Sequence, residues 1–520
     1  MGIGVDLDRA NALLGARQFP EAIEVLSKIV TKRPREARAL HMLGVAHAQC
    51  GQQATAEAFL KRATDAAPRS AAVLTDFATL LAMTGRARDA LPLLEKALRL
   101  EPRLEQAAFY RGVALTNSGR LNEALAAFDE LIAKSPGTQI YHFNRATVLV
   151  KLDRLDQAEA IADQLLATQP TLTPMLLVKC LALADRRSHQ EAIAVCDRIL
   201  AREQANAEAR YNRGHLKLLL GDLAGGFADH ESRLSRPAHP DPSPAPQIPR
   251  WRGEPLEGRS LLVYCEQGFG DTLHFCRYLP ELAARGADVT LHAPRPIGAL
   301  LRTLSDKTRI VDAIDPSATF DYQIALLSLP LRLGTVLSNI PNTVPYLRAQ
   351  PERAARWQQK IGAGGFKIGI AWQGNPQAEF DKSRSVALRE FLPLSQIPGA
   401  RLISLQKNFG IEQINALPPD MKVETLGEEF DAGNDAFLDT AAVMQHLDLV
   451  IAPNTAIAHL AGALARPLVI PLDFNSDWRW FLDRTDSPWY PSARLYRQQT
   501  RGDWGPVFAE IAADVRSRLA

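Results

Sequence analysis

The sequence has 520 residues, more than one hydrophobic core usually organises, and so predicts two to four domains. Its 46% hydrophobic and 23% charged residues are typical of a soluble globular protein, and its net charge of +2 disfavours nucleic acid as the main partner. The sequence contains no apolar run long enough to span a bilayer, and its start does not resemble a signal peptide, so we expect a cytoplasmic protein without a transmembrane segment.

The cysteines and the other metal-binding residue types do not indicate a metal site. The five cysteines are scattered, without a CxxC pair, which is typical of buried thiols in a reducing compartment. No cluster of His, Cys, Asp and Glu has metal-ligand spacing. We therefore expect no metal and no tightly bound cofactor.

A 34-residue period runs through the first part of the chain. Prolines recur at this spacing, at Pro34, Pro68, Pro102, Pro136 and Pro170. Alanines recur in step, at Ala22, Ala56, Ala90, Ala124, Ala158 and Ala192. Small residues where helices cross, with a proline after every second helix, form the tetratricopeptide pattern. We expect residues 1–231 to form an α-solenoid of about five good repeats followed by degenerate ones, because the phase slips near Gln204.

A solenoid of this kind has a concave groove that can hold a segment of another protein. The repeat phase places several apolar and aromatic side chains on the groove side. Four of them are predicted to bind a partner protein: Phe109, Ile140, Phe143 and Tyr211. The alternative is that some of these side chains pack between neighbouring helices.

A proline-rich linker separates the repeats from the rest of the chain. Residues 232–257 contain seven prolines, which exclude a helix or a central strand. Beyond the linker, short apolar strands alternate with helices, which predicts parallel sheets. We expect two Rossmann-like halves, residues 258–345 and 346–520, and so a protein that combines an α-solenoid with an α/β region.

Apolar runs place the strands of each half. In the first half we expect strands at 259–265, 288–292, 309–311 and 322–326. In the second half we expect them at 367–372, 401–405, 422–425, 447–452 and 467–471. Helices are expected at 272–285, 352–361, 441–446 and 506–518. A dinucleotide site is excluded because Gly268 and Gly270 lack the third glycine of GxGxxG, and the sequence has no P-loop.

The turn after the strand at 447–452 is a candidate anion site. Asn454 and Thr455 follow Pro453 and can cap a helix of small and apolar residues. A helix that begins at the carboxyl end of a parallel strand presents unpaired backbone N–H groups and the positive end of its dipole. A phosphate fits such a turn. The alternative is an ordinary strand–helix unit whose cap serves only the helix.

Four segments of the second part of the chain point to a family when they are taken in order. They are EQGFGDTLHFCRYLP, GIAWQGNP followed by DKSRS, DTAAVMQHLDLVIAPNTAIAHLAGAL, and DWRWFLDRTDSPWYPSARLYRQ. Together they resemble segments of tetratricopeptide-containing bacterial glycosyltransferases, whose catalytic domain is related to the lipopolysaccharide heptosyltransferases. The resemblance covers residues 261–498. It implies a GT-B fold, with a nucleotide-sugar donor on the C-terminal half and an acceptor facing the N-terminal half. A subset of the family resembles flagellin-modifying transferases that use a CMP-activated nonulosonic acid, and the motifs do not separate that subset.

Asp271 is the candidate catalytic base. It follows Gly270 where a glycine-rich turn meets a helix, at the carboxyl edge of the first strand, and its carboxylate could take the proton of an acceptor hydroxyl. The related heptosyltransferases place their proposed base at this Gly-Asp position. Two alternatives stay open: Asp271 only caps the helix, or Glu266 on the same loop is the base.

The residues expected to bind the donor come from three segments. Lys382 and Arg384 lie in a polar loop beyond the strand at 367–372, where they could neutralise the donor phosphate. The proposed phosphate cradle is formed by Asn454, Thr455 and Ala456, with His459 one turn further along and Gly270 on the first half. The family pattern has Asp where this chain has Asn454, so the sugar and any metal dependence stay open.

These features predict a glycosyltransferase that moves a sugar from a nucleotide-sugar co-substrate to Ser or Thr hydroxyls of a protein held by the repeats, with flagellin as one candidate acceptor. One rival interpretation is a non-catalytic adaptor whose transferase domain has decayed, which the Asn454 departure supports. Another keeps the enzyme but gives it a glycan or a lipid headgroup as acceptor. The solenoid argues against that second rival, since small acceptors need no such groove.

Overall fold

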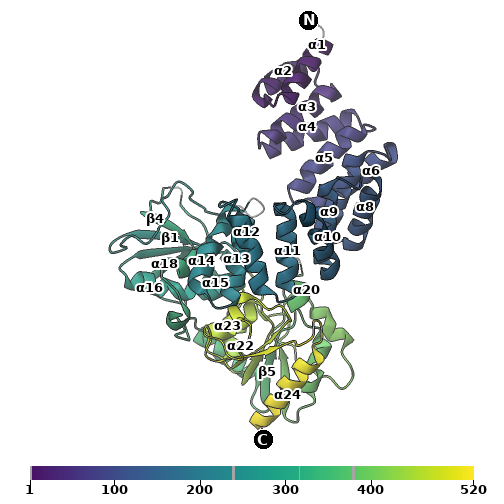
Figure 1. The fold of residues 1–520 in the computed structure, drawn as a ribbon. Coiled ribbons are helices and arrows are strands. Elements are labelled where there is room, and N and C mark those ends of the chain that lie inside the picture. The colour runs from purple at the N-terminus through teal and green to yellow at the C-terminus, as the bar shows by residue number, and fades with distance from the viewer. Residues whose placement is uncertain (1–2, 237–240, 316, 377–380, 520) are drawn as a thin grey trace. The chain divides into compact units, whose positions relative to one another are not determined.

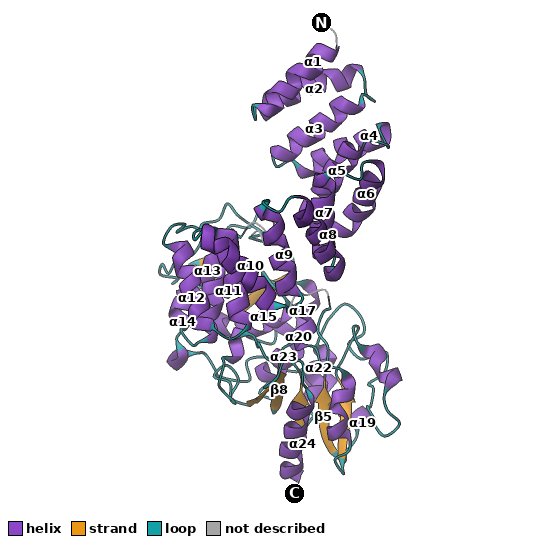
Figure 2. Cartoon of the chain, turned by 45° about the vertical axis from the view of Figure 1, so that its right-hand side comes forward, coloured by secondary structure: helices purple, strands orange, loops and turns teal. Residues whose placement is uncertain are grey.

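A computed structural model of the chain describes residues 3–236, 241–315, 317–376 and 381–519, without the side chains of 381 and 382. The chain forms two compact units, Met1–Val195 and Cys196–Ala520. Helices make up the first unit, and strands appear only in the second (Figures 1 and 2). None of the described helices is long and apolar enough to cross a membrane.

Fourteen helices form the repeat array in the described part of the chain. They are α1 Ile3–Gly15, α2 Phe19–Lys32, α3 Ala37–Gln49, α4 Gln53–Ala66, α5 Ala71–Met83, α6 Ala87–Leu100, α7 Glu105–Asn117, α8 Leu121–Lys134, α9 Gln139–Lys151, α10 Leu155–Thr168, α11 Thr173–Asp185, α12 His189–Leu200, α13 Ala207–Leu219 and α14 Leu223–His230. The boundary between the units falls within α12, so α13 and α14 belong to the second unit.

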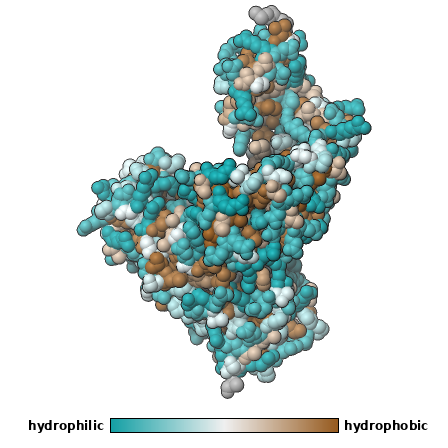
Figure 3. Space-filling model, in the orientation of Figure 1, coloured by the Kyte–Doolittle hydropathy of each residue, from teal (hydrophilic) through white to brown (hydrophobic). Residues whose placement is uncertain are grey.

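The 34-residue period is confirmed by the packing of these helices. All six alanines in phase with Ala22 are completely buried. The prolines from Pro34 to Pro170 each lie just after the second helix of a pair. Gly112 shows why the helix crossings need small residues, because a Cβ built there would lie 2.7 Å from Cζ of Phe128. The face of the molecule in Figure 3 is mostly hydrophilic, as expected when apolar side chains are buried between helices.

Two parallel sheets form the α/β part of the second unit. The first sheet has the order β3-β2-β1-β4 and the second β6-β5-β7-β8-β9, and every pairing is parallel. The strands are β1 Ser260–Tyr264, β2 Asp288–His292, β3 Thr308–Val311, β4 Tyr322–Ala325, β5 Phe366–Ile370, β6 Ala400–Ser404, β7 Leu449–Ile451, β8 Leu468–Leu472 and β9 Ala493–Arg497. The predicted fold class is therefore confirmed at this level: an N-terminal helical solenoid followed by a region with parallel sheets.

Three differences from the expected elements concern the strands and the helix that carries Asp271. Residues 422–425 form an isolated bridge between Ile403 and Glu424 rather than a strand. The edge strand β9 was not expected, because its residues alternate between exposed Arg494 and buried Leu495 beside a run of aromatics. The helix expected at 272–285 is divided into α15 Phe269–Phe275, a 3₁₀ turn and α16 Leu279–Ala284, because Pro280 can only occupy the first turn of a helix.

The helices around the sheets complete the second unit. They include α17 Arg295–Leu301, α18 Leu329–Arg332, α19 Pro351–Ile361, α20 Asp381–Arg384, α21 Leu392–Ser395, α22 Leu438–Met444, α23 Ala456–Ala463 and α24 Gly505–Leu519. One hydrophobic core joins residues beside both sheets to Leu218, Leu223 and Phe227 of the last repeat helices. The linker is fixed at its far end, where buried Trp251 donates its backbone N–H to the Gln323 carbonyl. The second unit is therefore built from the last repeat as well as from the two sheets.

Candidate functional site

The turn after β7 presents backbone N–H groups at the start of α23. Thr455 occupies the N-cap position in an extended conformation, but among the described residues its side chain makes no capping hydrogen bond. The backbone N–H groups of Ala456 and Ile457 likewise have no acceptor within the described part of the chain. Asn454, Thr455, Ala456 and Ile457 are all half-buried, so solvent reaches them. The turn therefore keeps the donors that an anion would use.

Asp271 lies in the first turn of α15. Its side chain is 23% exposed, and its Oδ1 accepts a hydrogen bond of 2.5 Å from Nη2 of Arg479. Burial raises the pKa of Asp271 above its ordinary value, and the Arg479 charge opposes that rise. A hydrogen bond from the Gly268 backbone also lowers this pKa, so Asp271 does contribute to capping α15. A carboxylate with a raised pKa is a stronger base, and capping leaves lone pairs for a second role.

Gly270 brings α15 and α23 together. A Cβ built on Gly270 would lie 3.1 Å from Cδ2 of His459 and 3.6 Å from both N and Cα of Ala456. The two helices pack along each other and lie side by side in both ribbon views (Figures 1 and 2). The absence of a side chain at Gly270 thus sets the predicted base beside the predicted phosphate turn, although 183 residues separate Asp271 from Asn454 in the sequence.

Arg479 is a site residue that sequence reasoning missed. Its Nη1 donates to both oxygens of Asp477, at 2.9 and 3.0 Å, while its Nη2 reaches Asp271. Its guanidinium carbon lies 4.4 Å from the ring centre of Trp478. Burial would lower the pKa of Arg479, but Asp477 and Asp271 outweigh it, so the pKa lies above its ordinary value. The signal in the sequence is an arginine between Trp478 and Trp480 and two residues after Asp477, a pattern that a packed aromatic segment also gives.

His459 lies behind the turn in a chain of polar aromatic residues. Its Nδ1 and the Nδ1 of His274 each lie 3.0 Å from the hydroxyl oxygen of Tyr490. Burial lowers the pKa of His459 to about 3, so its imidazole is neutral near pH 7. The ring also stacks on Trp480, with ring centres 5.5 Å apart. His459 therefore supports the turn as a neutral, oriented side chain.

The predicted cationic loop is described only in part. The side chain of Lys382 lies outside the described residues, so its phosphate-binding role stays a prediction. Arg384 ends α20, and its charge lowers the pKa of both Asp271 and His459, which places it near the site. Glu266 is not available as the base, because its side chain is 4% exposed and both its oxygens accept hydrogen bonds from Arg233.

The four residues predicted to bind a partner differ in exposure and in the unit to which they belong. Phe109 and Phe143 are half-buried against the core of the array, and Ile140 is 46% exposed. Tyr211 lies in the second unit, where its ring stacks on His230 and lies under the guanidinium of Arg236, 4.0 Å from its ring centre. Ile140 is thus the most exposed of the four. No group of three or more His, Cys, Asp and Glu residues in the described chain is placed to hold a metal.

Comparison with known proteins supports the repeat assignment. The tetratricopeptide repeat family matches residues 7–71, 75–138, 117–173 and 143–208. The first part of the chain therefore carries tetratricopeptide repeats. Protein FlbA of Caulobacter vibrioides is 30% identical over 341 residues, which cover 60% of this chain and 56% of FlbA. The chain thus spans little more than half the length of this relative.

Two solved tetratricopeptide proteins are similar in part. One, from Parabacteroides merdae, is 17% identical with a TM-score of 0.40, covering 44% of this chain and 90% of that protein. The other, YrrB, described as having an unusual peptide-binding site, is 22% identical with a TM-score of 0.30 and covers 33% of this chain and 88% of its own.

Proposed function

We propose that the second unit is a glycosyltransferase of the GT-B type, which transfers a sugar from a nucleotide-sugar donor to a hydroxyl of a protein that the repeats recruit. The observation that carries the proposal is the packing of Gly270 on Ala456. It sets a carboxylate that solvent reaches beside backbone N–H groups that have no acceptor in the described chain. These are the two groups that glycosyl transfer from a phosphate leaving group requires.

In the proposed reaction, the acceptor oxygen forms a bond to the anomeric carbon, and the bond between that carbon and the donor phosphate oxygen breaks. The hydroxyl proton passes to Asp271, whose raised pKa suits a base. The charge that develops on the phosphate is stabilised by the N–H groups of Ala456 and Ile457 and by Arg384. Arg479 binds one oxygen of Asp271 and so orients its carboxylate.

The repeats supply the acceptor in this proposal. Tetratricopeptide arrays bind segments of other proteins in their groove. The repeat phase predicts Ile140 on the groove side, and its exposed side chain offers apolar surface for such contact. Holding the acceptor near the site raises its effective concentration, so a weak acceptor site suffices. Flagellin, and a CMP-nonulosonic acid donor, remain candidates that follow only from the family resemblance of the motifs.

A donor panel tests the proposal. The full chain is incubated with UDP-, GDP-, ADP- and CMP-sugars, and donor hydrolysis and thermal shift are measured. We expect one nucleotide class to raise the unfolding midpoint and to be hydrolysed. A chain that responds to no donor would instead fit the non-catalytic adaptor, the interpretation that Asn454 supports because it removes a carboxylate expected at the phosphate turn.

A further inference from the structure

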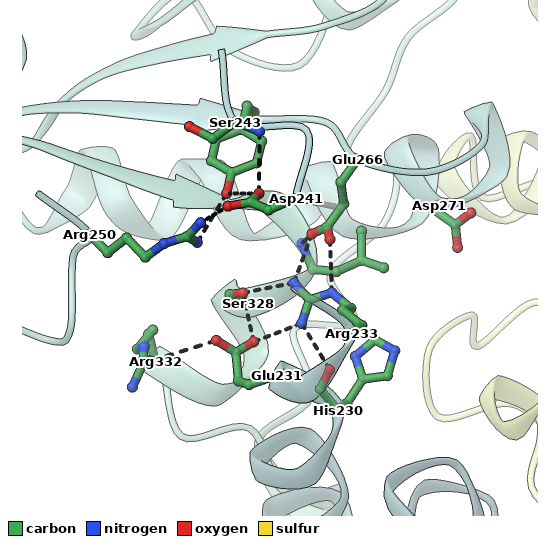
Figure 4. Close-up of polar contacts among 12 residues, drawn as sticks. His230, Glu231, Arg233, Asp241, Ser243, Arg250, Glu266, Asp271, Ser328 and Arg332 are labelled. Atoms are coloured by element: carbon green, nitrogen blue, oxygen red, sulfur yellow. Dashed lines mark hydrogen bonds and ion pairs between the residues drawn. The ribbon is translucent and has the colours of Figure 1, made fainter. Parts of the chain in front are cut away.

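The turn that carries Asp271 is attached to the last helical repeat by a buried ion pair. Arg233 lies in the 3₁₀ turn Glu231–Ser235 that follows α14. Its Nε and Nη2 each donate to a different oxygen of Glu266, both at 2.8 Å (Figure 4). Both side chains are only 4% exposed. Two parallel hydrogen bonds between buried charges fix the orientation of both groups, so this pair joins two segments 33 residues apart.

The surroundings satisfy every donor of Arg233. Its Nη1 donates to Glu231 at 2.8 Å and to the His230 carbonyl at 3.3 Å, and its Nη2 also donates to Ser328 at 2.8 Å. With the two bonds to Glu266, all five N–H groups have acceptors. Glu266 in turn accepts the Leu327 backbone N–H at 3.1 Å. A fully bonded buried arginine is held in one orientation, and loss of Glu266 leaves two of its N–H groups buried without an acceptor.

Glu266 stands directly before the turn that starts α15. Gly268 is the N-cap of that helix and Asp271 is in its first turn. In Figure 4 the Glu266 carboxylate is directed toward Arg233, whereas Asp271 lies apart on the following helix. The position of Glu266 therefore sets where α15 begins, and so where the Asp271 carboxylate lies against α23.

The last repeat also supports the other side of the site. Helix α13 packs against the 3₁₀ turn Trp478–Trp480, which carries Arg479. Phe227 of α14 meets Trp478 edge to face, with ring centres 5.6 Å apart. The last repeat thus holds both segments that meet at the ion pair between Asp271 and Arg479.

We propose that Arg233 and Glu266 are positioning residues for the transfer site, and that the 3₁₀ turn Glu231–Ser235, which carries Arg233, serves the site rather than the recruited protein. The pair touches no substrate; it keeps the turn at 266–271 in the position where Asp271 faces the acceptor. The inference rests on the proposed function for its effect on catalysis.

Point variants of the full chain test the inference, with Arg233→Met and Glu266→Gln removing the pair. The matched control is Arg213→Met. Arg213 also binds a carboxylate with two hydrogen bonds, to Asp229 at 2.7 Å each, and both partners lie within the last repeat. Within the described chain, the other hydrogen bonds of this pair go to Asp197 and Lys217 rather than to the 266–271 turn. We expect kcat to fall about 100-fold in the first two variants, as for a reacting group displaced by about 1 Å, while KM for the donor changes less than about twofold. In the control, kcat should stay within about twofold even where the unfolding midpoint drops.

Hydrogen exchange provides a readout that does not depend on activity. The backbone amides of residues 265–271 should exchange faster in Arg233→Met and Glu266→Gln than in the wild type or in Arg213→Met. Arg233→Lys keeps the charge but not the two-point bond, so an intermediate kcat and intermediate exchange are expected; it also serves where the methionine variant does not fold.

The outcomes separate this inference from the proposed function. Folded variants with wild-type kcat and unchanged exchange at 265–271 would overturn the inference, as would an equal loss of kcat in Arg213→Met. If the wild type uses no nucleotide sugar, the proposed function fails, and exchange alone then decides whether the pair fixes the turn.

Discussion

The two units of the molecule use charge in different ways. In Met1–Val195 the ion pairs are exposed, as between Lys28 and Glu24, both 70% exposed, or half-buried, as between His41 and Asp76. The buried polar side chains among the described residues of this unit are Thr75 and His189. In Cys196–Ala520, charged groups such as Arg233, Asp439 and Arg479 are buried and bonded to opposite charges. Surface pairs contribute little stability, whereas buried charges are costly unless they are fully bonded. The comparison indicates that apolar periodicity holds the first unit together, whereas the second unit also depends on buried charges that are bonded to one another.

The largest effect is expected at Asp271. Replacement by Asn keeps the shape but removes the base, so the transfer rate should fall about 10²–10⁴-fold. Donor binding should persist, because the phosphate turn is unchanged. Sugar transfer and donor affinity are measured on the same preparation. A variant that keeps more than a tenth of wild-type transfer would place the base elsewhere.

A core substitution in the first unit should lower the stability of that unit without affecting donor hydrolysis by the second. Phe128 is fully buried in the array, so Phe128→Ala should lower the free energy of unfolding of that unit by about 3–5 kcal/mol. Donor hydrolysis should stay unchanged while transfer to the protein acceptor falls. Phe391→Ala, at an equally buried phenylalanine of the second unit, is the matched control and should reduce hydrolysis. Equal effects of the two variants on hydrolysis would show that the units are not independent.

Acid should destabilise the second unit through its buried histidines. Burial lowers the pKa of His459 from 6.5 to about 3. Below about pH 6.5 the imidazole is therefore protonated in the unfolded chain but stays neutral in the folded chain. The free energy of unfolding should therefore decrease as pH falls below about 6.5, by at most about 1.4 kcal/mol per pH unit for this residue.

Asp473 acts in the opposite direction. Burial raises its pKa to about 6, so as pH falls through 6 the folded chain binds a proton that the unfolded chain does not yet bind. This residue alone therefore increases the free energy of unfolding on acidification. The test therefore compares urea denaturation at pH 7 and pH 5 in the wild type and in His459→Gln. The variant should show the weaker loss of stability on acidification, and identical losses in both proteins would refute a neutral buried His459.

The smallest expected effect is a shift in the pH dependence of kcat/KM. Burial raises the pKa of Asp271, and the positive charge of Arg479 opposes that rise. In Arg479→Met the pKa should rise further, so the acidic limb of the kcat/KM profile should move to higher pH. A limb that stays in place, or moves to lower pH, would mean that Asp271 is not the group that titrates.

Much of the fold followed from local sequence signals. The alanine and proline phases located the repeat helices, and β2 occupies the residues expected from its apolar run. These features depend on residues close in sequence. The turn at 454–456 was likewise found from its strand and helix, although Thr455 does not provide the capping bond that its residue type suggested.

The bonds that assemble the site could not be predicted in the same way. Arg479 meets Asp271 across 208 residues, and Arg233, at the start of the proline-rich segment 232–257, meets Glu266 beyond the end of that segment. No period or motif links such partners, and each arginine alone is typical of a solvated surface. Glu266 was considered as a base because it lies on the same loop as Asp271, and only its burial by Arg233 excludes that role.

The most direct test of the phosphate turn is nucleotide binding to Ala456→Pro. Ala456 is the first residue of α23 and follows an extended Thr455, a position where proline fits and removes only one N–H group. Isothermal titration of the wild type and the variant with the nucleotide released by the active donor gives both affinities. The account predicts binding to the wild type and about tenfold weaker binding to a variant with an unchanged unfolding midpoint, as expected for loss of one charge-assisted hydrogen bond. Equal affinity of the two proteins, or no binding of any nucleotide to the wild type, would contradict it.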